Sequence, residues 1–518
     1  MQAIGRWMVF LVLMVGSSGV AWGAGFTFPE NMTRSAGRGG ASIASIDTAG
    51  ALYLNPGALS RTGFLSLTMD LNIVNQDLCF QRAPYRYSTG VGGENTVNFE
   101  EECNLETLFL APMFFGAMRI ADLPLVLAAG VYGPSANGRM RFREMSTDAP
   151  EPNFSNPTVT RTGGQSYLLT DMTTYVFYPS FAAAWTFEDI GLSLGATAQL
   201  VGSLIEYRLA VEGDGIALPG TPAEIAAGAR SIEDPGFLSY TTLRVSGLGF
   251  TGILGALYEP TRSWAFGLSW RPRHRLTSSG SIDVEFPPAF EDQNLQLSDD
   301  SVDLEINFPH VVALGVNYRH HQGDRLLFDA EASFVWEGWS VLEYFPVRSR
   351  GRIADHPEGG GPSGTLVDRP LPEFRIGKYY DDAWSLRLGG AYHGFLREDG
   401  ERGVVLRAGG FYEAGASPDA WSHVDFYSPD RIGLGAGLSV HFGALSLDAA
   451  YQHVFSPDRN VTNGAFELIT PLWICASPQD EDERRACAAT EGGPGHAVNN
   501  GRYRTSLNLF SLGVTARF

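Results

Sequence analysis

The amino-acid sequence predicts an all-β fold: a transmembrane antiparallel β-barrel of about 14 strands, with an N-terminal hatch that plugs the lumen. Three observations predict it. Apolar residues alternate with small or polar residues through most of the chain, arginine recurs within or near the polar side of that alternation, and aromatic residues lie at the ends of the apolar side. In such a barrel each strand turns one face to lipid and the other to the lumen, and these residues follow that pattern.

The composition excludes several other classes of protein. The chain has 518 residues, of which 44% are hydrophobic, 12% aromatic and 18% charged, and its formal net charge is −20. A disordered chain would have few aromatic residues and dense charge. A helical membrane bundle would need apolar runs of about 20 residues, and no run beyond the N-terminus approaches that length. A negatively charged chain without a visible basic face also argues against binding to nucleic acid.

Residues 1–23 have the pattern of a secretory signal peptide. Arg6 is the only charged residue among the first 29, an apolar stretch follows it at 7–15, and small residues end at Gly23. This predicts cleavage after Gly23 rather than a membrane anchor, because the apolar core is short and no stop-transfer charges follow. Export in turn permits disulfides.

Residues 24–61 are predicted to form a compact hatch, followed by the barrel at 62–518. They show no sustained alternation, have helix starts near Glu30 and at Pro56, and are rich in glycine and alanine. A barrel of about 14 strands has an interior wider than its own side chains can fill. A small-residue segment ahead of the first strand is suited to occupy that space.

The alternation is clearest at 264–271, 312–319, 432–442 and 510–518. A soluble β-sandwich would show the same alternation with its apolar face buried. The recurring arginines and the aromatic ends favour the lipid-facing arrangement instead. The arginines are Arg271, Arg319, Arg387, Arg407, Arg431 and Arg517, and the aromatic residues are Trp264, Trp270, Tyr318, Trp384, Tyr392 and Tyr451.

Fourteen strand segments are predicted, near 62–76, 105–120, 124–133, 171–187, 190–211, 238–258, 263–286, 302–320, 324–336, 382–394, 402–413, 429–442, 445–456 and 502–518. An even number, with short and long connections in alternation, is typical of an up-and-down barrel with both termini in the periplasm. The long connections, expected to be extracellular, lie near 77–104, 134–170, 212–237 (with a short helix at 222–230), 287–301, 337–381, 414–428 and 457–501.

The four cysteines are predicted to form two local disulfides, Cys79–Cys103 and Cys475–Cys487, each pinning one long loop. Neither spacing is the close C-x-x-C of zinc or redox sites, and free thiols without a role are the alternative. Acidic residues also gather in the predicted outer loops. They indicate a solvated, self-repelling surface, while the alternative, divalent-cation bridging to lipopolysaccharide, has no supporting ligand spacing.

Several short motifs of the N-terminal segment occur together. The mature chain would start Ala-Gly-Phe at 24–26, the small-residue run 35–41 follows, and the run 52–57 ends in Asn55-Pro56-Gly57. These residues resemble the hatch of the FadL-type long-chain fatty acid transporters, a family that also includes outer-membrane channels for aromatic hydrocarbons. The family motif ends in Asn-Pro-Ala, and the missing methyl group at Gly57 is expected to loosen the turn. Further similarity extends over nearly the whole mature chain, at 178–182, 308–319, 429–435 and 445–453.

The resemblance implies a non-enzymatic, passive route for hydrophobic small molecules across the bacterial outer membrane. The cargo would enter an apolar pocket above the hatch and leave sideways through a kink in the third strand. Gly130, Gly133 and Pro134 are the kink candidates, because glycine and proline disfavour ladder pairing; the alternative is that they only begin a long loop. Phe26 and Phe28 are the pocket or gating candidates, again by resemblance.

A fatty acid would also need a cation near the pocket for its carboxylate. The candidates are Arg271, Arg387 and Arg407. The alternative is that these arginines pair with the lumen acids, such as Asp329, Glu331 and Asp448.

The expected partners are hydrophobic molecules, outer-membrane lipid and lipopolysaccharide, and the barrel-assembly machinery, which would act through the C-terminal Phe518. The chain is expected to be a monomer without catalytic residues, cofactor or metal. A general or polar-solute porin is the alternative function, and it would lack the plug and the kinked strand. A hydrolase is disfavoured, because His393 and His441 have no serine or acid at a spacing that forces a triad. An adhesin is also disfavoured, because it would not need a hatch.

Overall fold

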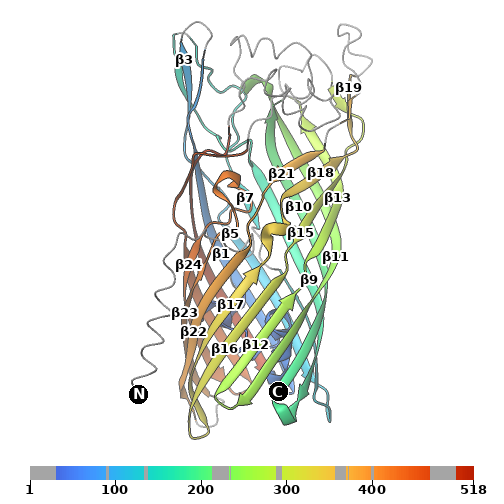
Figure 1. Cartoon of the computed structure of the whole chain (residues 1–518), viewed down its shortest axis with the longest axis vertical. Coiled ribbons are helices and arrows are strands. Elements are labelled where there is room, and N and C mark those ends of the chain that lie inside the picture. Colours follow the sequence, from blue (N-terminus) through green and yellow to red (C-terminus); the bar gives the residue numbers. More distant parts are fainter. Residues whose placement is uncertain are drawn as a thin grey trace.

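The chain forms a closed antiparallel barrel of fourteen strands in a computed structural model, as the sequence predicts (Figure 1). The last strand, β27, pairs with the first, β1, from Ser66↔Arg517 to Arg82↔Gly501. A sheet closed in this way pairs its edges, which a lipid environment requires. The structure describes residues 31–88, 93–133, 138–153, 155–212, 233, 235–286, 295–355, 369–370, 373–397, 402–466 and 497–518.

Two of the fourteen predicted segments are each divided into two strands. The seventh segment, predicted as 263–286, is broken at Pro272, and the eighth, predicted as 302–320, is broken at Pro309. Proline has no N–H to donate to the ladder, so each strand pauses there. In ring order the wall is β1 (Leu65–Arg82), β5 (Leu108–Arg119), β6 (Leu125–Tyr132), β9 (Asp171–Phe187), β10 (Leu192–Glu212), β11 (Leu238–Thr261), β12 with β13 (Trp264–Arg271, His274–Glu285), β15 with β16 (Ser301–Phe308, Val311–Gln322), β17 (Arg325–Glu337), β22 (Ala383–Leu396), β23 (Arg402–Glu413), β24 (Arg431–Phe442), β25 (Leu445–Phe455) and β27 (Gly501–Arg517).

The long connections gather at one end of the barrel, which we call the loop end (Figure 1). They contain more strand than predicted: β18 pairs with both β15 and β21, so parts of the predicted loop 337–381 extend the wall. The remaining elements are β2 (Tyr85–Ser88), β3 (Glu94–Phe99), β4 (Glu102–Cys103), β7 (Arg139–Arg141), β8 (Thr158–Arg161), β14 (Leu295–Leu297), β18 (Tyr344–Ser349), β19 (Arg352–Asp355), β20 (Arg369–Pro370), β21 (Phe374–Gly377), β26 (Arg459–Val461) and the 3-10 turns η2 (Glu188–Ile190), η3 (Pro235–Phe237), η5 (Trp339–Val341) and η6 (Asp419–Trp421).

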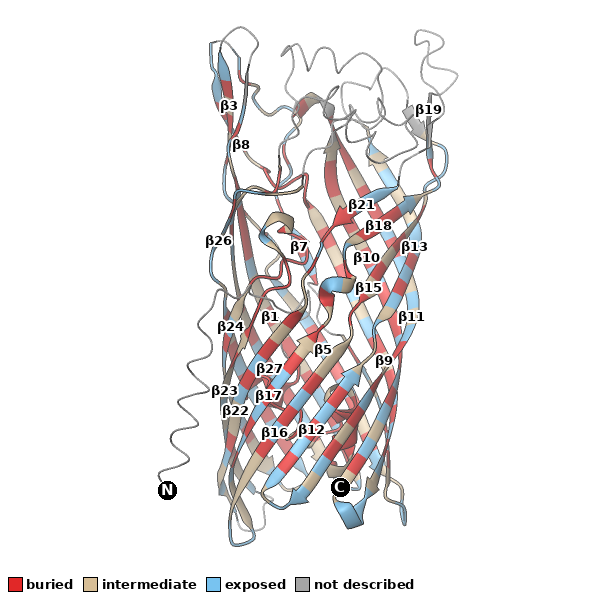
Figure 2. Cartoon of the chain, in the orientation of Figure 1, coloured by how far each residue is buried: buried red, intermediate tan, exposed pale blue. Residues whose placement is uncertain are grey.

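The alternation places apolar side chains outside and polar side chains inside, as predicted. On β1, Leu67 and Met69 are 49% and 47% exposed, whereas Thr68, between them, is 5% exposed. Figure 2 shows the same alternation of buried and exposed residues along the other strands of the wall. The exposed apolar residues include Phe181, Leu248, Phe250 and Leu388, together with the aromatic residues Trp185, Trp264, Trp270, Tyr392 and Tyr451. Among the described residues, no helix is long and apolar enough to span a membrane.

The described part of the N-terminal segment, residues 31–61, lies inside the barrel. It contains two short helices, α2 (Thr33–Ala36) and α3 (Ala51–Leu54), and the 3-10 turn η1 (Pro56–Arg61). The Thr197 hydroxyl of β10 donates to the Leu52 carbonyl over 2.8 Å, and the Ala44 N–H donates to Glu331 of β17 over 3.0 Å. The segment is therefore held by two separate parts of the ring, at its fifth and ninth strands.

Glycine on the wall lets the segment approach this closely. A Cβ atom at Gly389 of β22 or Gly409 of β23 would overlap the carbonyl oxygen of Arg38, and one at Gly267 of β12 would lie 2.5 Å from the carbonyl oxygen of Ile43. The segment thus lies directly on the wall backbone at these points. The wall glycines at which a Cβ would meet the segment are Gly195, Gly255, Gly267, Gly315, Gly389, Gly409, Gly435, Gly437 and Gly513, which we call the collar glycines.

Replacing a collar glycine is expected to displace the segment. In Gly409→Ala, the new Cβ would overlap the Arg38 carbonyl oxygen, so the barrel should form but Arg34, Arg38 and Arg61 should become accessible to trypsin, as measured by fragment masses in detergent. Gly116→Ala is the matched control, because the nearest atom to its Cβ is a Leu67 side-chain atom 3.3 Å away. Equal resistance of both variants would contradict this account of the contact.

Candidate functional site

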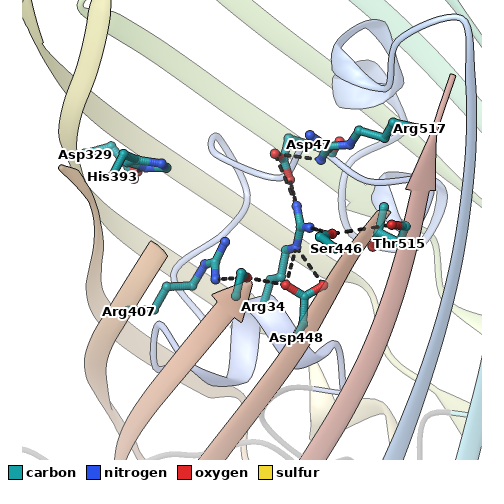
Figure 3. Close-up of polar contacts among 10 residues, drawn as sticks. Arg34, Asp47, Asp329, His393, Arg407, Ser446, Asp448, Thr515 and Arg517 are labelled. Carbon is teal, nitrogen blue, oxygen red and sulfur yellow. Dashed lines mark hydrogen bonds and ion pairs between the residues drawn. The ribbon is translucent and has the colours of Figure 1, made fainter. Parts of the chain in front are cut away.

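A network of buried charges anchors the first helix of the segment to the wall (Figure 3). The Arg34 Nε atom lies 3.1 Å from both carboxylate oxygens of Asp448 on β25, and its Nη2 atom donates to the Ser446 hydroxyl over 2.6 Å. Its Nη1 atom lies 3.1 Å from Asp47, which pairs in turn with Arg517 of β27 at 2.8 Å. A buried charge is tolerable only when it is paired and hydrogen-bonded, so these contacts define where the segment lies.

A second arginine of the segment makes a similar contact on another wall. Arg38 forms an ion pair of 2.5 Å with Asp329 of β17, and both side chains are buried. The other carboxylate oxygen of Asp329 lies 2.8 Å from Nε2 of His393, which comes from β22. Asp329 also accepts from the Asn317 amide over 3.1 Å. His393 is therefore one of several partners of a lumen acid.

Hydrogen bonds of the Asn55 side chain hold the turn Asn55-Pro56-Gly57 against the wall. The Asn55 side chain accepts from the Gly57 N–H over 3.1 Å and donates to the carbonyls of Ile43, over 2.9 Å, and Ala256, over 3.0 Å. A Cβ at Gly57 would lie 2.8 Å from the Ala256 backbone of β11. Glycine at this position thus allows close contact with the wall.

A loop between β23 and β24 crosses the loop end of the lumen. Its Asp425 carboxylate pairs with Lys378 and His423 and accepts from the Tyr207 hydroxyl of β10 over 2.9 Å. β10 and β23 are the fifth and eleventh strands of the ring, so this contact spans the barrel. Burial lowers the pKa of His423 to about 4 and lowers the pKa of Lys378. We call the buried residues 423–427 the cap.

Between the cap and the N-terminal segment, aromatic side chains line one side of the lumen. The Tyr132 ring of β6 stacks on Tyr178 of β9, with centroids 5.3 Å apart and an interplanar angle of 11°. Tyr53 of α3 lies 4.4 Å from the Tyr132 ring. The His274 ring of β13 stacks on Phe308, with centroids 4.7 Å apart. We call Tyr53, Phe115, Tyr132, Tyr178, His274 and Phe308 the aromatic cluster.

The three candidate arginines point inward but differ in their partners. Arg387 donates to the Ser385 hydroxyl over 3.1 Å and lies 4.0 Å from Glu413. Arg407 donates to Ser439, which donates to Asp448 and so joins the Arg34 network. Arg271 lies against the aromatic cluster, with Nη2 3.3 Å from the Tyr132 hydroxyl. Arg387 thus pairs with a lumen acid, Glu413, as the alternative had it. Among the described residues Arg271 and Arg407 form no ion pair within 4 Å, and Asp448 and Asp329 pair instead with Arg34 and Arg38 of the segment.

The third wall strand, β6, is short for its position. It pairs with β5 only from Phe114↔Val131 to Arg119↔Val126, although β5 begins at Leu108. Among the described residues, the ladder between β5 and the third strand therefore ends near Gly130, where the kink was predicted. Gly133 follows the last paired residue, and Pro134 lies outside the described residues.

The remaining predicted positions divide into described and undescribed residues. Cys79 of β1 and Cys103 of β4 form the predicted disulfide. At the seam, the Phe518 N–H donates to the Leu65 carbonyl over 2.9 Å. Outside the described residues lie the predicted signal peptide, the start of the predicted hatch with Phe26 and Phe28, the helix predicted at 222–230, and Cys475 with Cys487.

Sequence reasoning missed the residues that anchor the segment and those that form the aromatic cluster. Arg34 and Arg38 lie four positions apart in a run of small residues, and that spacing was the available signal. Tyr132, Tyr178 and His274 carried no such signal, because an inward aromatic residue looks like any other wall residue in the alternating pattern.

Comparisons with known proteins agree with this geometry. A family model described as outer membrane protein transport protein (OMPP1/FadL/TodX) matches residues 14–470. A Pseudomonas aeruginosa FadL homologue has a TM-score of 0.67 at 17% identity, covering 96% of this chain and 100% of that chain. The P. putida toluene transporter TodX has a TM-score of 0.55 at 13% identity, covering 96% and 99%. The Ralstonia pickettii toluene transporter TbuX has a TM-score of 0.54 at 14% identity, covering 95% of this chain and 99% of that chain. These structural likenesses show the fold alone. No curated protein sequence matches the chain at a significant level.

Removing Arg38 is expected to destabilise the protein strongly. Arg38→Met leaves the buried Asp329 carboxylate without its ion-pair partner, which typically costs about 3–5 kcal/mol. The measurement is the free energy of unfolding in urea, from reconstituted protein. Arg38→Met with Asp329→Asn should recover part of the loss, because the orphaned charge is gone. Arg262→Ala breaks the exposed pair with Asp324 and should change the free energy little. A loss in Arg38→Met no larger than in this control would contradict the anchoring role.

Proposed function

The chain belongs to the outer membrane protein transport family (OMPP1/FadL/TodX), and we propose that it is a passive channel for hydrophobic small molecules, such as long-chain fatty acids, other lipids or hydrocarbons. It is a bacterial outer-membrane β-barrel. The observation that carries the proposal is the aromatic cluster, enclosed in the lumen between the N-terminal segment and the cap. A water-filled pore needs no aromatic surface of this kind, whereas an apolar cargo would bind to it.

The physical advantage of this route is the burial of apolar surface. Lipopolysaccharide slows the direct entry of apolar molecules into the outer leaflet, and an aqueous lumen offers them nothing to bind. Transfer of apolar area to a lined pocket gains roughly 25 cal/mol per Å². The pocket can therefore capture a dilute apolar molecule without an energy source.

The N-terminal segment acts in this proposal as a hatch. With residues 1–23 removed as a signal peptide, residues 24–61 would fill the lumen on the side of the termini and leave 62–518 as the barrel. The buried pairs of Arg34 and Arg38 support a hatch that stays in place during transport. We propose further that the protein is a monomer that contacts lipopolysaccharide. The barrel-assembly machinery would recognise its C-terminal Phe518.

We propose that cargo leaves sideways, beside the short strand β6. Three observations support this exit. The β5 residues before Phe114 lack a third-strand partner among the described residues. Pro112 on β5 and Pro179 on β9 cannot donate to the ladder. An open apolar groove on the outer surface is lined by Gly130 together with Leu67, Met69, Phe114 and Val131. Cargo passing here would enter the membrane and avoid the aqueous periplasm.

The proposal is tested by uptake into cells that contain or lack the gene. We expect labelled oleate or labelled toluene to accumulate faster with the gene, while a polar control such as arabinose does not, because the lumen is filled. Gene-independent uptake of both apolar compounds would defeat the transport proposal. Faster arabinose uptake with no effect on either apolar compound would favour the alternative, a general or polar-solute porin.

Closing the ladder beside β6 is expected to stop lateral exit. If pairing continued past Phe114↔Val131, Pro112 would face Gly133, so a Pro112→Cys, Gly133→Cys disulfide would hold the two strands together. Oxidised protein should lose most uptake of the apolar compound, and dithiothreitol should restore it. The control disulfide joins positions 116 and 129, which are already paired. Full uptake by the oxidised Pro112→Cys, Gly133→Cys protein would rule out this exit.

A further inference from the structure

One inward-facing arginine is without a carboxylate partner. Arg271 ends β12 and points into the lumen, as does the buried Ser269 two residues earlier. Among the described residues it has no acid within 4 Å, and its Nε–H has no hydrogen-bond partner. Arg34 and Arg38, by contrast, are both paired with wall acids. An unpaired cation in a water-poor lumen is costly, and an anionic ligand would relieve that cost.

The surroundings of Arg271 are aromatic. Its guanidinium carbon lies 5.6 Å from the ring centre of Tyr53 and 6.0 Å from that of Tyr178. Tyr178 stacks on Tyr132 and meets the His274 ring edge-on, with centroids 6.5 Å apart and an interplanar angle of 84°. A flat ring inserted here would gain stacking or edge contacts that an alkyl chain lacks.

Two further polar side chains of this cluster have unused hydrogen-bonding atoms. Neither ring nitrogen of His274 has a partner among the described residues, and the same is true of Oε1 of Gln199, a side chain that is 1% exposed. Gln199 is part of the same cluster, since its Nε2 donates to the Tyr132 hydroxyl over 2.6 Å. Buried polar atoms in native proteins are nearly always satisfied, so unused ones mark a place for a ligand or ordered water.

The burial of Arg271 and His274 also differs from that of their inward neighbours. Arg271 and His274 point inward and yet remain half-buried rather than fully buried. An inward side chain that keeps accessible surface borders an internal space. Arg387 and Arg407 do not offer an equivalent site, because both are engaged by neighbouring side chains.

We propose, building on the transport function above, that this cluster binds an aromatic carboxylate. The Arg271 guanidinium and a His274 N–H donate to the carboxylate, and the ring of the ligand packs among Tyr53, Tyr132 and Tyr178. A neutral hydrocarbon would leave the cation and the imidazole unpaired. An aliphatic acid would satisfy the cation but forgo the ring contacts. The charge thus selects the acid, and the tyrosines select the aromatic ring.

The test compares matched ligands on the full-length protein in lipid nanodiscs. Isothermal titration is used with 4-ethylbenzoate, with 4-ethyltoluene as its neutral counterpart, and with decanoate as an aliphatic acid. We expect wild-type protein to bind 4-ethylbenzoate about tenfold or more tightly than either of the others. Arg271→Gln should remove the preference over 4-ethyltoluene and leave 4-ethyltoluene binding unchanged. His274→Phe, which keeps the stacked ring, should weaken 4-ethylbenzoate alone.

Two controls keep the test specific. Arg275→Gln removes a nearby arginine of β13 that faces outward and pairs with Glu305, and it should not affect binding. Tyr178→Leu should reduce the preference for 4-ethylbenzoate over decanoate while the acid still requires Arg271. A circular dichroism spectrum and heat-modifiable gel migration verify that each variant is folded.

The outcomes separate this inference from the transport function. Equal binding of 4-ethylbenzoate by wild type and folded Arg271→Gln would overturn the carboxylate site, and decanoate binding as tight as 4-ethylbenzoate would overturn the aromatic selection. Failure of all three ligands to bind, with gene-dependent oleate or toluene uptake intact, would overturn the inference and leave the channel standing. Failure of both binding and uptake would overturn the channel itself.

Discussion

The constraint on which the rest of the structure depends is the contact between the N-terminal segment and the inner wall of the barrel. The segment brings cations, Arg34 and Arg38, and the wall brings anions, Asp448 and Asp329, and all of them are buried. Neither set could remain charged in this environment without the other. The wall strands β22, β23 and β24 carry glycine where the segment passes, because any side chain there would push the backbone away. Charge pairing and close packing therefore specify the same position for the segment.

This contact also shapes the space above it. The segment places Tyr53 beneath Tyr132, and the cap, held to β10 by Asp425, closes the loop end. The lumen is thereby reduced from a channel along the axis to a compartment on one side of the wall. Within it Arg271 departs from the pairing that Arg34, Arg38 and Lys378 follow, because no carboxylate lies within 4 Å of it among the described residues. The departure coincides with aromatic rings and with the short strand β6, so the unpaired cation, the apolar surface and the weak point of the wall lie together.

The outer face is under a different demand. A barrel in lipid must pair its backbone groups throughout, so any opening must be local and must be made by residues that weaken only one ladder. Gly130 and Pro112 lie on the two sides of the ladder between β5 and β6. On the opposite side of the ring, β17 and β22 pair without interruption from Phe328↔Tyr392 to Glu337↔Ala383. The shortened ladder and the long uninterrupted ladder thus lie in different parts of one sheet.

What the sequence by itself determined was the local geometry. Side chains alternate across a strand, so the lipid face, the lumen face and the number of strands follow from residue order along each segment, and Cys79 could be matched with Cys103 by proximity in the chain. The N-terminal segment was set apart from the wall by its lack of alternation, and its interpretation as a hatch drew also on the resemblance to a family. Proline accounts for the breaks at Pro272 and Pro309. The wall strand within the loop predicted at 337–381 needed the pairing of β18 with β15 and β21 to appear. The partners of charged residues were decided only by the tertiary structure: Arg34 and Asp448 are 414 residues apart, and they meet because the ring closes around the segment. For the same reason Arg271 and Arg407, which look alike in the alternating pattern, differ in their surroundings.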